Sequence, residues 1–133
     1  MAARSPVVLI VDDHEDSRAM YAFGLLAMGF QAEVAATGED ALARVGELHP
    51  DVIVADVSLP GMSGLDLTRR LRGDPSTRET GILVLTGHAG SAVMREANAA
   101  GCDRFLLKPC LPDALVCEIR DLLLHRQHDP PRV

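Results

Sequence analysis

Acidic side chains stand at the points where apolar segments of this sequence end. The apolar run "VVLIV" ends in Asp12 and Asp13, and the run "VIVA" ends in Asp56. Clustered carboxylates repel one another and lose hydration unless a cation lies among them. Oxygen ligands with open coordination positions suit Mg²⁺, with Mn²⁺ as a possible substitute, and no EF-hand loop is present to favour Ca²⁺. We therefore expect a magnesium site where these segments meet in the fold.

Two more polar residues end apolar segments later in the chain. Thr86 ends "GILVLT", and Lys108 follows "FLL" and precedes Pro109. A lysine and a hydroxyl around a metal-bound carboxylate form an electrostatic clamp for phosphoryl transfer. In that chemistry Asp56 is the nucleophile and an aspartyl-phosphate is the covalent intermediate. The predicted catalytic residues are therefore Asp56, Lys108 and Thr86.

These residues are positioned by an alternation of strands and helices that repeats five times along the chain. Apolar runs predict strands, and apolar residues at helical spacing predict helices. Predicted strands cover 7–11, 31–36, 51–56, 81–86 and 102–108, and predicted helices cover 15–28, 37–49, 65–72, 87–101 and a last segment from Pro112. Such alternation predicts an α/β fold whose parallel sheet is covered by helices on both faces.

One fold that fits this alternation is a flavodoxin-like, doubly wound (βα)5 fold with a five-stranded parallel sheet in the order 2-1-3-4-5, and we adopt it as the predicted fold. Two strand orders are common for such sheets, and in both the ligand lies beyond the carboxyl ends of the strands where the order reverses. Strands one and three are neighbours in this order, about 4.8 Å apart. We therefore expect Asp12, Asp13 and Asp56 at one mouth, with Thr86 and Lys108 further along the same edge.

The chain of 133 residues has the size of one domain with a single core. Its net charge of −6 argues against direct binding of nucleic acid, which normally needs a basic face. No stretch approaches the roughly 20 apolar residues of a membrane span, so we expect a cytoplasmic protein without membrane contact.

The expected boundaries are a tail at 1–5, one domain at 6–126, and a tail or the start of a linker at 127–133. The three cysteines, Cys102, Cys110 and Cys117, are expected as reduced thiols.

Several segments in order resemble the receiver domain of two-component response regulators, over roughly residues 6–125. They are the Asp12–Asp13 pair after its strand, "DVIVADVSLPGMSG", "ILVLTGHA" and "FLLKP". The resemblance implies that Asp56 is the phosphoacceptor and that Asp13 binds Mg²⁺ directly. It further implies that Asp12 acts on the metal through water and that the backbone carbonyl of Ser58 is another ligand.

The resemblance also implies a switch and its partners. Thr86 matches the switch hydroxyl, Phe105 matches the switch aromatic, and Ser58 and His88 lie where the family tunes dephosphorylation. The expected phosphodonor is a sensor histidine kinase or a histidine phosphotransfer protein. Phosphorylation would change contacts on the face of the fourth helix, fifth strand and fifth helix, towards a protein target or a fused output domain. The protein is expected to be a monomer or a phosphorylation-dependent dimer, and to be either a stand-alone protein or part of a longer regulator. It is also expected to act as a signalling switch that assists its own phosphorylation and dephosphorylation.

The sequence departs from the family pattern at two positions and leaves two other functions open. Phe105 has no hydroxyl, and Cys110 follows Pro109 where many relatives carry an apolar aromatic residue. A phosphohydrolase of the haloacid dehalogenase type is one alternative, although its D-x-D-x-T pattern is absent after Asp56. A flavodoxin-like flavin protein is the other, although acids stand where a Ser/Thr-rich phosphate loop is expected.

Three smaller expectations concern residues outside the predicted centre. The glycines of "GMSG" are expected to form turns. Residues 69–73, "RRLRG", are expected on a solvated helix face. Of the histidines, His14 could influence the acidic pocket because it follows the acid pair directly, and the others are expected at the surface.

Overall fold

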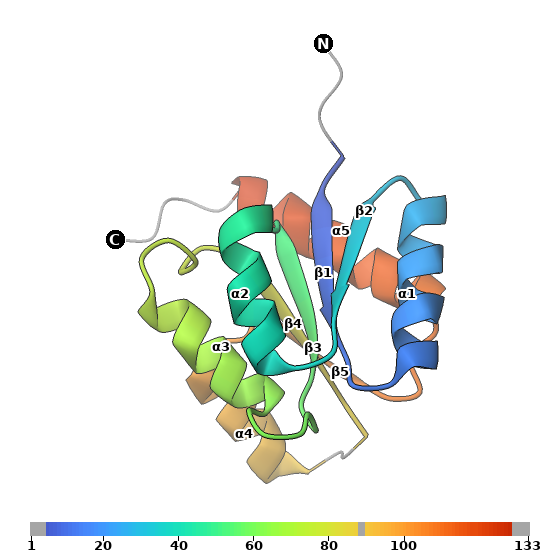
Figure 1. Ribbon diagram of the computed structural model, residues 1–133. Coiled ribbons are helices and arrows are strands. Elements are labelled where there is room, and N and C mark those ends of the chain that lie inside the picture. Colours follow the sequence, from blue (N-terminus) through green and yellow to red (C-terminus); the bar gives the residue numbers. More distant parts are fainter. Residues whose placement is uncertain (1–4, 88–89, 129–133) are drawn as a thin grey trace.

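The computed structural model describes residues 5–87 and 90–128 and contains a five-stranded parallel sheet flanked by five helices (Figure 1). The strand order is β2-β1-β3-β4-β5, which confirms the predicted flavodoxin-like topology. The strands are β1 (Val7–Val11), β2 (Gln31–Ala35), β3 (Val52–Asp56), β4 (Gly81–Thr86) and β5 (Arg104–Leu107). The helices are α1 (Glu15–Ala27), α2 (Gly38–Leu48), α3 (Gly64–Gly73), α4 (Ser91–Ala100) and α5 (Pro112–His128).

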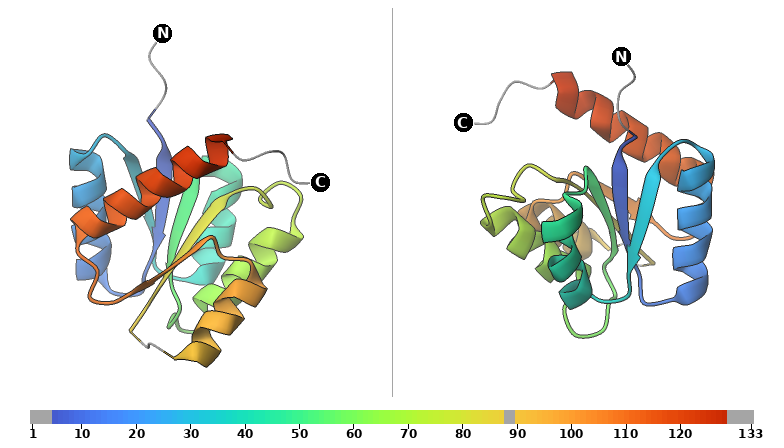
Figure 2. Two further views of the ribbon diagram at one scale, coloured as in Figure 1. Left: turned by 180° about the vertical axis from the view of Figure 1, so that it is seen from behind. Right: turned by 45° about the horizontal axis from the view of Figure 1, so that its top comes forward.

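Two apolar cores lie on opposite faces of the sheet. Helices α1 and α5 cover one face, and α2, α3 and α4 cover the other (Figure 2). Successive strand residues point to opposite faces, so β1 contributes Val8 and Ile10 to the α1–α5 side and Leu9 and Val11 to the other. All four are at most 1% exposed. This two-sided burial explains why β1, β3 and β4 read as continuous apolar runs rather than as alternating ones.

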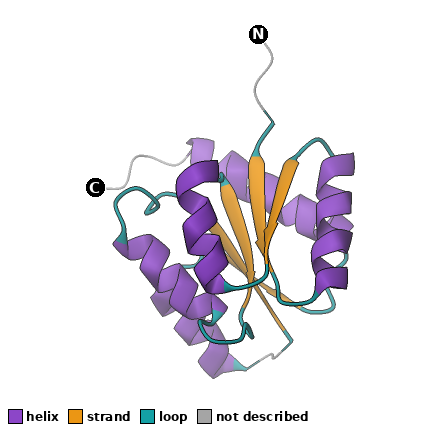
Figure 3. Ribbon diagram, viewed as in Figure 1, coloured by secondary structure: helices purple, strands orange, loops and turns teal. Residues whose placement is uncertain are grey.

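All five strands run in the same direction, so their carboxyl ends meet at the lower edge of the sheet in Figure 3. Val11 pairs with Ala55, and Asp56 pairs with Leu85. Beyond the strands, the Asp12 N–H donates to Ala35 O and the Lys108 N–H donates to Thr86 O. The backbone ladder therefore continues for one residue past β1 and β5 and fixes the height of both side chains at this edge.

Some boundaries differ from the predicted ones for local physical reasons. Helix α4 begins at Ser91, later than predicted, because Gly90 before it has extended backbone angles. Strand β3 begins at Val52, since the Asp51 side chain accepts a hydrogen bond from the Val7 N–H at 2.8 Å and thereby ties the starts of two strands together. Helix α5 continues to His128, the last residue that the structure describes.

The expectation that residues 69–73 form a solvated face is wrong for two of them. Leu71 is buried in the core between the sheet and α3. Arg72 is partly buried, and its guanidinium donates to Gly101 O at 2.8 Å and forms an ion pair with Asp103 at 2.8 Å. The same Asp103 oxygen accepts from the Ile82 N–H. Arg72 therefore joins the end of α3 to the loop before β5 and to the start of β4.

The two glycines of "GMSG" have different roles. Gly61 has a positive φ of 76° and is a turn residue, as predicted. Gly64 is instead the first residue of α3, and a Cβ placed on it would lie 2.3 Å from the backbone oxygen of Asp56. Helix α3 therefore packs directly on the backbone that carries Asp56, and no side chain fits between them.

We predict that Gly64→Ala lowers the free energy of unfolding by about 1–3 kcal/mol, since backbone must shift to admit the added methyl group. Gly46→Ala is the matched control, because a Cβ at Gly46 inside α2 meets nothing within 4 Å. The control should raise stability by about 0.5–1 kcal/mol through lower chain entropy. Urea unfolding of both variants measures the effect, and equal stability changes would contradict the close approach.

Candidate functional site

Two buried carboxylates lie side by side at the carboxyl ends of β1 and β3. Asp12 is 2% exposed and Asp56 is 6% exposed. The pairing of Val11 with Ala55 places the next residue of each strand, Asp12 and Asp56, at the same height on adjacent strands. Asp13, one residue further, is more exposed. The fold thus brings together acids that are more than forty positions apart in sequence.

Lys108 places its ammonium group between these two carboxylates. Its Nζ lies 2.6 Å from Asp56 Oδ2, within hydrogen-bond distance, and 3.6 Å from Asp12 Oδ2. Lys108 is also the only lysine of the sequence, in which all other basic residues are arginines. A compact ammonium on a flexible stem can serve two carboxylates at once, whereas a guanidinium prefers a planar, bidentate partner. The residue type at this position therefore matches the geometry of the site.

The environment of Lys108 favours its charged form. Partial burial acts to lower the pKa of Lys108, but the hydrogen bond to Asp56 and the negative charges of Asp56 and Asp12 outweigh it and raise the pKa above its ordinary value of 10.5. A raised pKa in the folded state stabilises the fold below the unfolded value and loses this effect only as the pH rises through the folded value. Lys108 is therefore positively charged at neutral pH, and its contribution to the ion pair is lost only in strong alkali.

Backbone N–H groups orient the two carboxylates. The Ser58 N–H donates to Asp56 Oδ1 at 2.9 Å, and the His14 N–H donates to Asp12 Oδ1 at 2.9 Å. Each acid thus receives a backbone donor on Oδ1 and faces Lys108 with Oδ2. Because both oxygens are held, neither carboxylate can rotate freely. The structure places Ser58 next to Asp56 through this N–H contact.

The donor set at the mouth of the site fits a divalent cation. One ligand atom from each of Asp12, Asp13 and His14 lies within 4.8 Å of the other two. Asp12 is buried whereas Asp13 and His14 are exposed, and carboxylate oxygens are the ligands that hard cations prefer. Asp12 and Asp13 are two of the predicted magnesium ligands, and the third donor of this group is His14 rather than the predicted Asp56.

The predicted switch residues lie on β4, which pairs with β3, and on β5, which pairs with β4. Thr86 ends β4 and is fully buried. Phe105, on β5, is partly buried and packs against the core on the α2–α3–α4 side. Phe105 pairs with Val84, two residues before Thr86, so both side chains belong to one region of the sheet. His88, the predicted tuning residue, lies outside the described residues.

Three contacts at the site were not predicted from the sequence. The Tyr21 hydroxyl donates to Cys110 O at 2.7 Å and ties α1 to the segment after Lys108. Burial raises the pKa of Tyr21, which keeps this hydroxyl protonated as a donor. Arg18 donates to Asp12 O at 2.8 Å. The third is the approach of Gly64 to Asp56. Tyr21 carried one signal, because a buried tyrosine hydroxyl usually needs a hydrogen-bond partner.

Comparison with known proteins decides the family. The family described as "Response regulator receiver domain" matches residues 8–120, most of the chain. The chain belongs to this family. The solved structure of the chemotaxis protein CheY4 from Vibrio cholerae superimposes with a TM-score of 0.85 at 32% identity, covering 89% of this chain and 98% of that one.

Two curated relatives show the same similarity within longer proteins. The phosphate regulon transcriptional regulatory protein PhoB of Rhizobium meliloti is 31% identical over 118 residues, which cover 89% of this chain and 52% of PhoB. The DNA-binding response regulator MtrA of Mycolicibacterium smegmatis is 33% identical over 123 residues, which cover 92% of this chain and 53% of MtrA. The receiver domain therefore spans about half the length of these relatives. Within residues 5–87 and 90–128, no helix has both the length and the apolar character needed to cross a bilayer.

We predict that Lys108→Met destabilises the receiver domain by about 2–4 kcal/mol in the presence of EDTA, because two buried carboxylates then lack their cation. Added Mg²⁺ should raise the stability of the variant more than that of the wild type, since the metal replaces the missing charge. Urea unfolding at pH 7.5 with EDTA or MgCl2 measures both effects.

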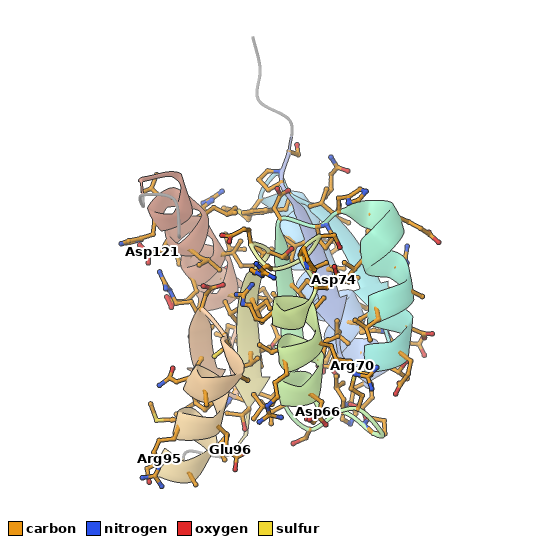
Figure 4. The ribbon with its side chains drawn as sticks, turned by 90° about the vertical axis from the view of Figure 1, so that its left-hand side faces the viewer. Asp66, Arg70, Asp74, Arg95, Glu96 and Asp121 are labelled. Carbon is orange, nitrogen blue, oxygen red and sulfur yellow. The ribbon has the colours of Figure 1, made fainter. Side chains whose placement is uncertain are left out.

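The control for this prediction is Arg104→Met, which breaks the exposed ion pair with Asp121 at the surface of α5 (Figure 4). A surface pair of this kind contributes at most about 1 kcal/mol. If Lys108→Met costs no more than this control, the buried carboxylates do not depend on Lys108.

Proposed function

We propose that this receiver domain is the phosphoacceptor of a two-component phosphorelay and is phosphorylated on Asp56 with Mg²⁺. The phosphodonor is a phosphohistidine on a sensor histidine kinase or a histidine phosphotransfer protein. The observation that carries the proposal is the placement of Asp56 beside Asp12 and Lys108, with each carboxylate oxygen of Asp56 held by a separate donor. A cytoplasmic location belongs to the same proposal and agrees with the free thiols of the described cysteines.

The chain's own residues prepare Asp56 for attack on phosphorus. An Asp56 oxygen forms the new bond to phosphorus, and the bond from phosphorus to the donor imidazole nitrogen breaks with its electron pair leaving on that nitrogen. The Ser58 N–H and Lys108 fix the direction of the Asp56 carboxylate. Asp56 is therefore already aligned for attack when the phosphodonor binds. Lys108 then pairs with a phosphoryl oxygen, and the buried Thr86 hydroxyl donates to another. Together these contacts stabilise charge that develops on the transferred group.

A divalent metal completes this arrangement in the proposal. Asp12, Asp13, Asp56 and the Ser58 carbonyl would hold Mg²⁺, with Asp12 acting through water, and Mn²⁺ is a possible substitute. When bound, the metal supplies positive charge that offsets the repulsion between the carboxylates and the incoming phosphoryl group.

Phosphorylation would be transmitted through β4 and β5 to a protein surface. A phosphate adds roughly −1.5 to −2 charge and three acceptor oxygens, which would draw Thr86 toward Asp56 and allow Phe105 to turn inward. Both residues border the surface of α4, β5 and α5, where Met94 and Leu107 are exposed apolar side chains. We propose that this surface changes its contacts with a protein target or a fused output domain, in a monomer or a phosphorylation-dependent dimer. Ser58 and His88 would set the lifetime of the phosphate.

The surface next to the site provides an apolar contact area for the phosphodonor protein. We call it the α1 patch: Met20, Phe23, Leu26 and Leu111, which are between 43% and 77% exposed. No charged residue occurs between Arg18 and Glu33. The Tyr21–Cys110 hydrogen bond and the approach of Gly24 to Pro112 hold α1 against the segment that follows Lys108, so the patch is continuous with the mouth of the site. A protein partner can therefore bury apolar area there while its phosphohistidine reaches Asp56.

We predict that wild-type protein incubated with Mg²⁺ and acetyl phosphate gains one phosphoryl group on Asp56, detectable by mass spectrometry. Asp56→Asn should gain none, and EDTA should abolish the gain in the wild type. Asp66→Asn is the control, because Asp66 lies at the surface of α3 in an exposed ion pair with Arg69 (Figure 4). Labelling of Asp56→Asn at the wild-type level would defeat the assignment of the phosphoacceptor.

We also predict that Phe23→Ser slows phosphotransfer from a histidine phosphotransfer protein about tenfold or more, because an exposed apolar anchor is lost. Phosphorylation by acetyl phosphate should stay at the wild-type rate, since this small donor needs no docking surface. Leu124→Ser removes a similarly exposed apolar side chain from the far part of α5 and should change neither rate. Equal slowing with both donors would mean that Phe23 acts on the site rather than on docking.

A further inference from the structure

An imidazole nitrogen lies next to the acids of the proposed metal site. His14 Nδ1 is 3.2 Å from Asp13 Oδ1 and 3.4 Å from Asp12 Oδ1. Donor atoms that are each about 2.1 Å from a metal lie roughly 3.0 Å apart at neighbouring octahedral corners and roughly 3.4 Å apart at tetrahedral corners. The two nitrogen–oxygen distances are close to those expected between neighbouring ligands of one metal ion, and they are also within ion-pair distance.

The side chain of His14 does not cap the helix that it precedes. His14 is the N-cap residue of α1, where Ser, Thr, Asp or Asn usually caps the helix through a side-chain oxygen. The His14 side chain makes no capping hydrogen bond, while its backbone N–H donates to Asp12 Oδ1. The imidazole is 70% exposed at the rim of the pocket, so a metal ion can reach it directly from solvent.

We propose that His14 makes this pocket selective for imidazole-preferring divalent metals, represented by Ni²⁺ and Co²⁺, over Mg²⁺. The inference rests on the proposed metal-dependent function of the same pocket and adds a residue to it. Imidazole is a strong ligand for these transition metals, whereas Mg²⁺ takes carboxylate, carbonyl and water oxygens. His14 therefore contributes to the affinity for Ni²⁺ and adds little to the affinity for Mg²⁺. Because Asp12 and Asp13 serve both ions, Ni²⁺ and Mg²⁺ compete for one site.

The chain has a built-in probe for this competition. Tyr21 is its only tyrosine and the sequence has no tryptophan, so intrinsic fluorescence comes from this one residue beside the site. Untagged protein is titrated with NiCl2 or MgCl2 at a fixed pH of 8, with calorimetry giving the affinity and quenching of Tyr21 by Ni²⁺ reporting where the ion binds. His14→Asn is the test variant. The matched control is His125→Asn, because His125 is also exposed and its Nδ1 lies 3.4 Å from Asp121 Oδ1.

His14→Asn should weaken Ni²⁺ binding at least tenfold and change Mg²⁺ binding less than twofold, and His125→Asn should change neither. Mg²⁺ added in excess should reverse the quenching by Ni²⁺. Unchanged Ni²⁺ affinity in His14→Asn, or an equal loss for Ni²⁺ and Mg²⁺, would overturn the inference. The unchanged Mg²⁺ affinity also shows that the variant is folded.

Labelling of Asp56 by acetyl phosphate with Mg²⁺ is measured separately on the same variants. If wild-type protein is labelled but His14→Asn binds Ni²⁺ normally, only the role of His14 is wrong. If Asp56 is not labelled while Ni²⁺ binding still depends on His14, the phosphorelay proposal fails and the metal preference stands.

Discussion

The ion pair of Lys108 with Asp56 and Asp12 is the interaction on which the rest of the site depends. Two carboxylates that are almost fully buried sit on adjacent strands, and a single ammonium group lies between them. Removing a charge from water costs several kcal/mol, and the pair tolerates this cost because each acid also accepts a backbone hydrogen bond. The other contacts of the pocket keep these charges buried and paired.

The scaffold supports this balance at the level of the backbone. Lys108 follows β5 and must reach across β4 to contact an acid at the end of β3, and the hydrogen bond from its N–H to Thr86 O sets the point from which it reaches. On the other side, α3 packs on the peptide of Asp56 through Gly64. Asp56 is therefore held between the ammonium group of Lys108 and the first residue of α3.

The same arrangement couples the pocket to the surface. Thr86 lies on β4 between the strand of Asp56 and the strand of Lys108 and Phe105. A change in the charge of Asp56 alters the ion pair that Lys108 forms. Because Lys108 follows β5, this affects β4 and β5, which α4 covers on one face of the sheet and α5 on the other. The α1 patch lies beside the mouth of the site and ends at Leu111, directly before α5. In the proposed function, the phosphodonor protein would contact this patch and the downstream partner would contact the neighbouring surface of α4, β5 and α5.

The sequence by itself determined the fold class and the identity of the residues at the carboxyl edge, and it narrowed the strand order to two common arrangements. Continuous apolar runs and helical apolar patterns are local properties, and the ends of parallel strands share one edge whatever fills the core. For this reason Asp12, Asp56, Thr86 and Lys108 could be placed at one mouth before any coordinates were known. The family resemblance added their predicted roles.

Only the tertiary structure decided which contacts these residues make. The approach of Gly64 to Asp56 and the inward turn of Arg72 depend on distances between elements, which local patterns do not contain. Arg72 illustrates the reason: its neighbours in sequence indicate a solvated helix, but its partners Gly101 and Asp103 come from a segment about thirty residues away. Sequence periodicity shows which face of a helix is apolar, but only the packed structure shows which residues contact its other faces.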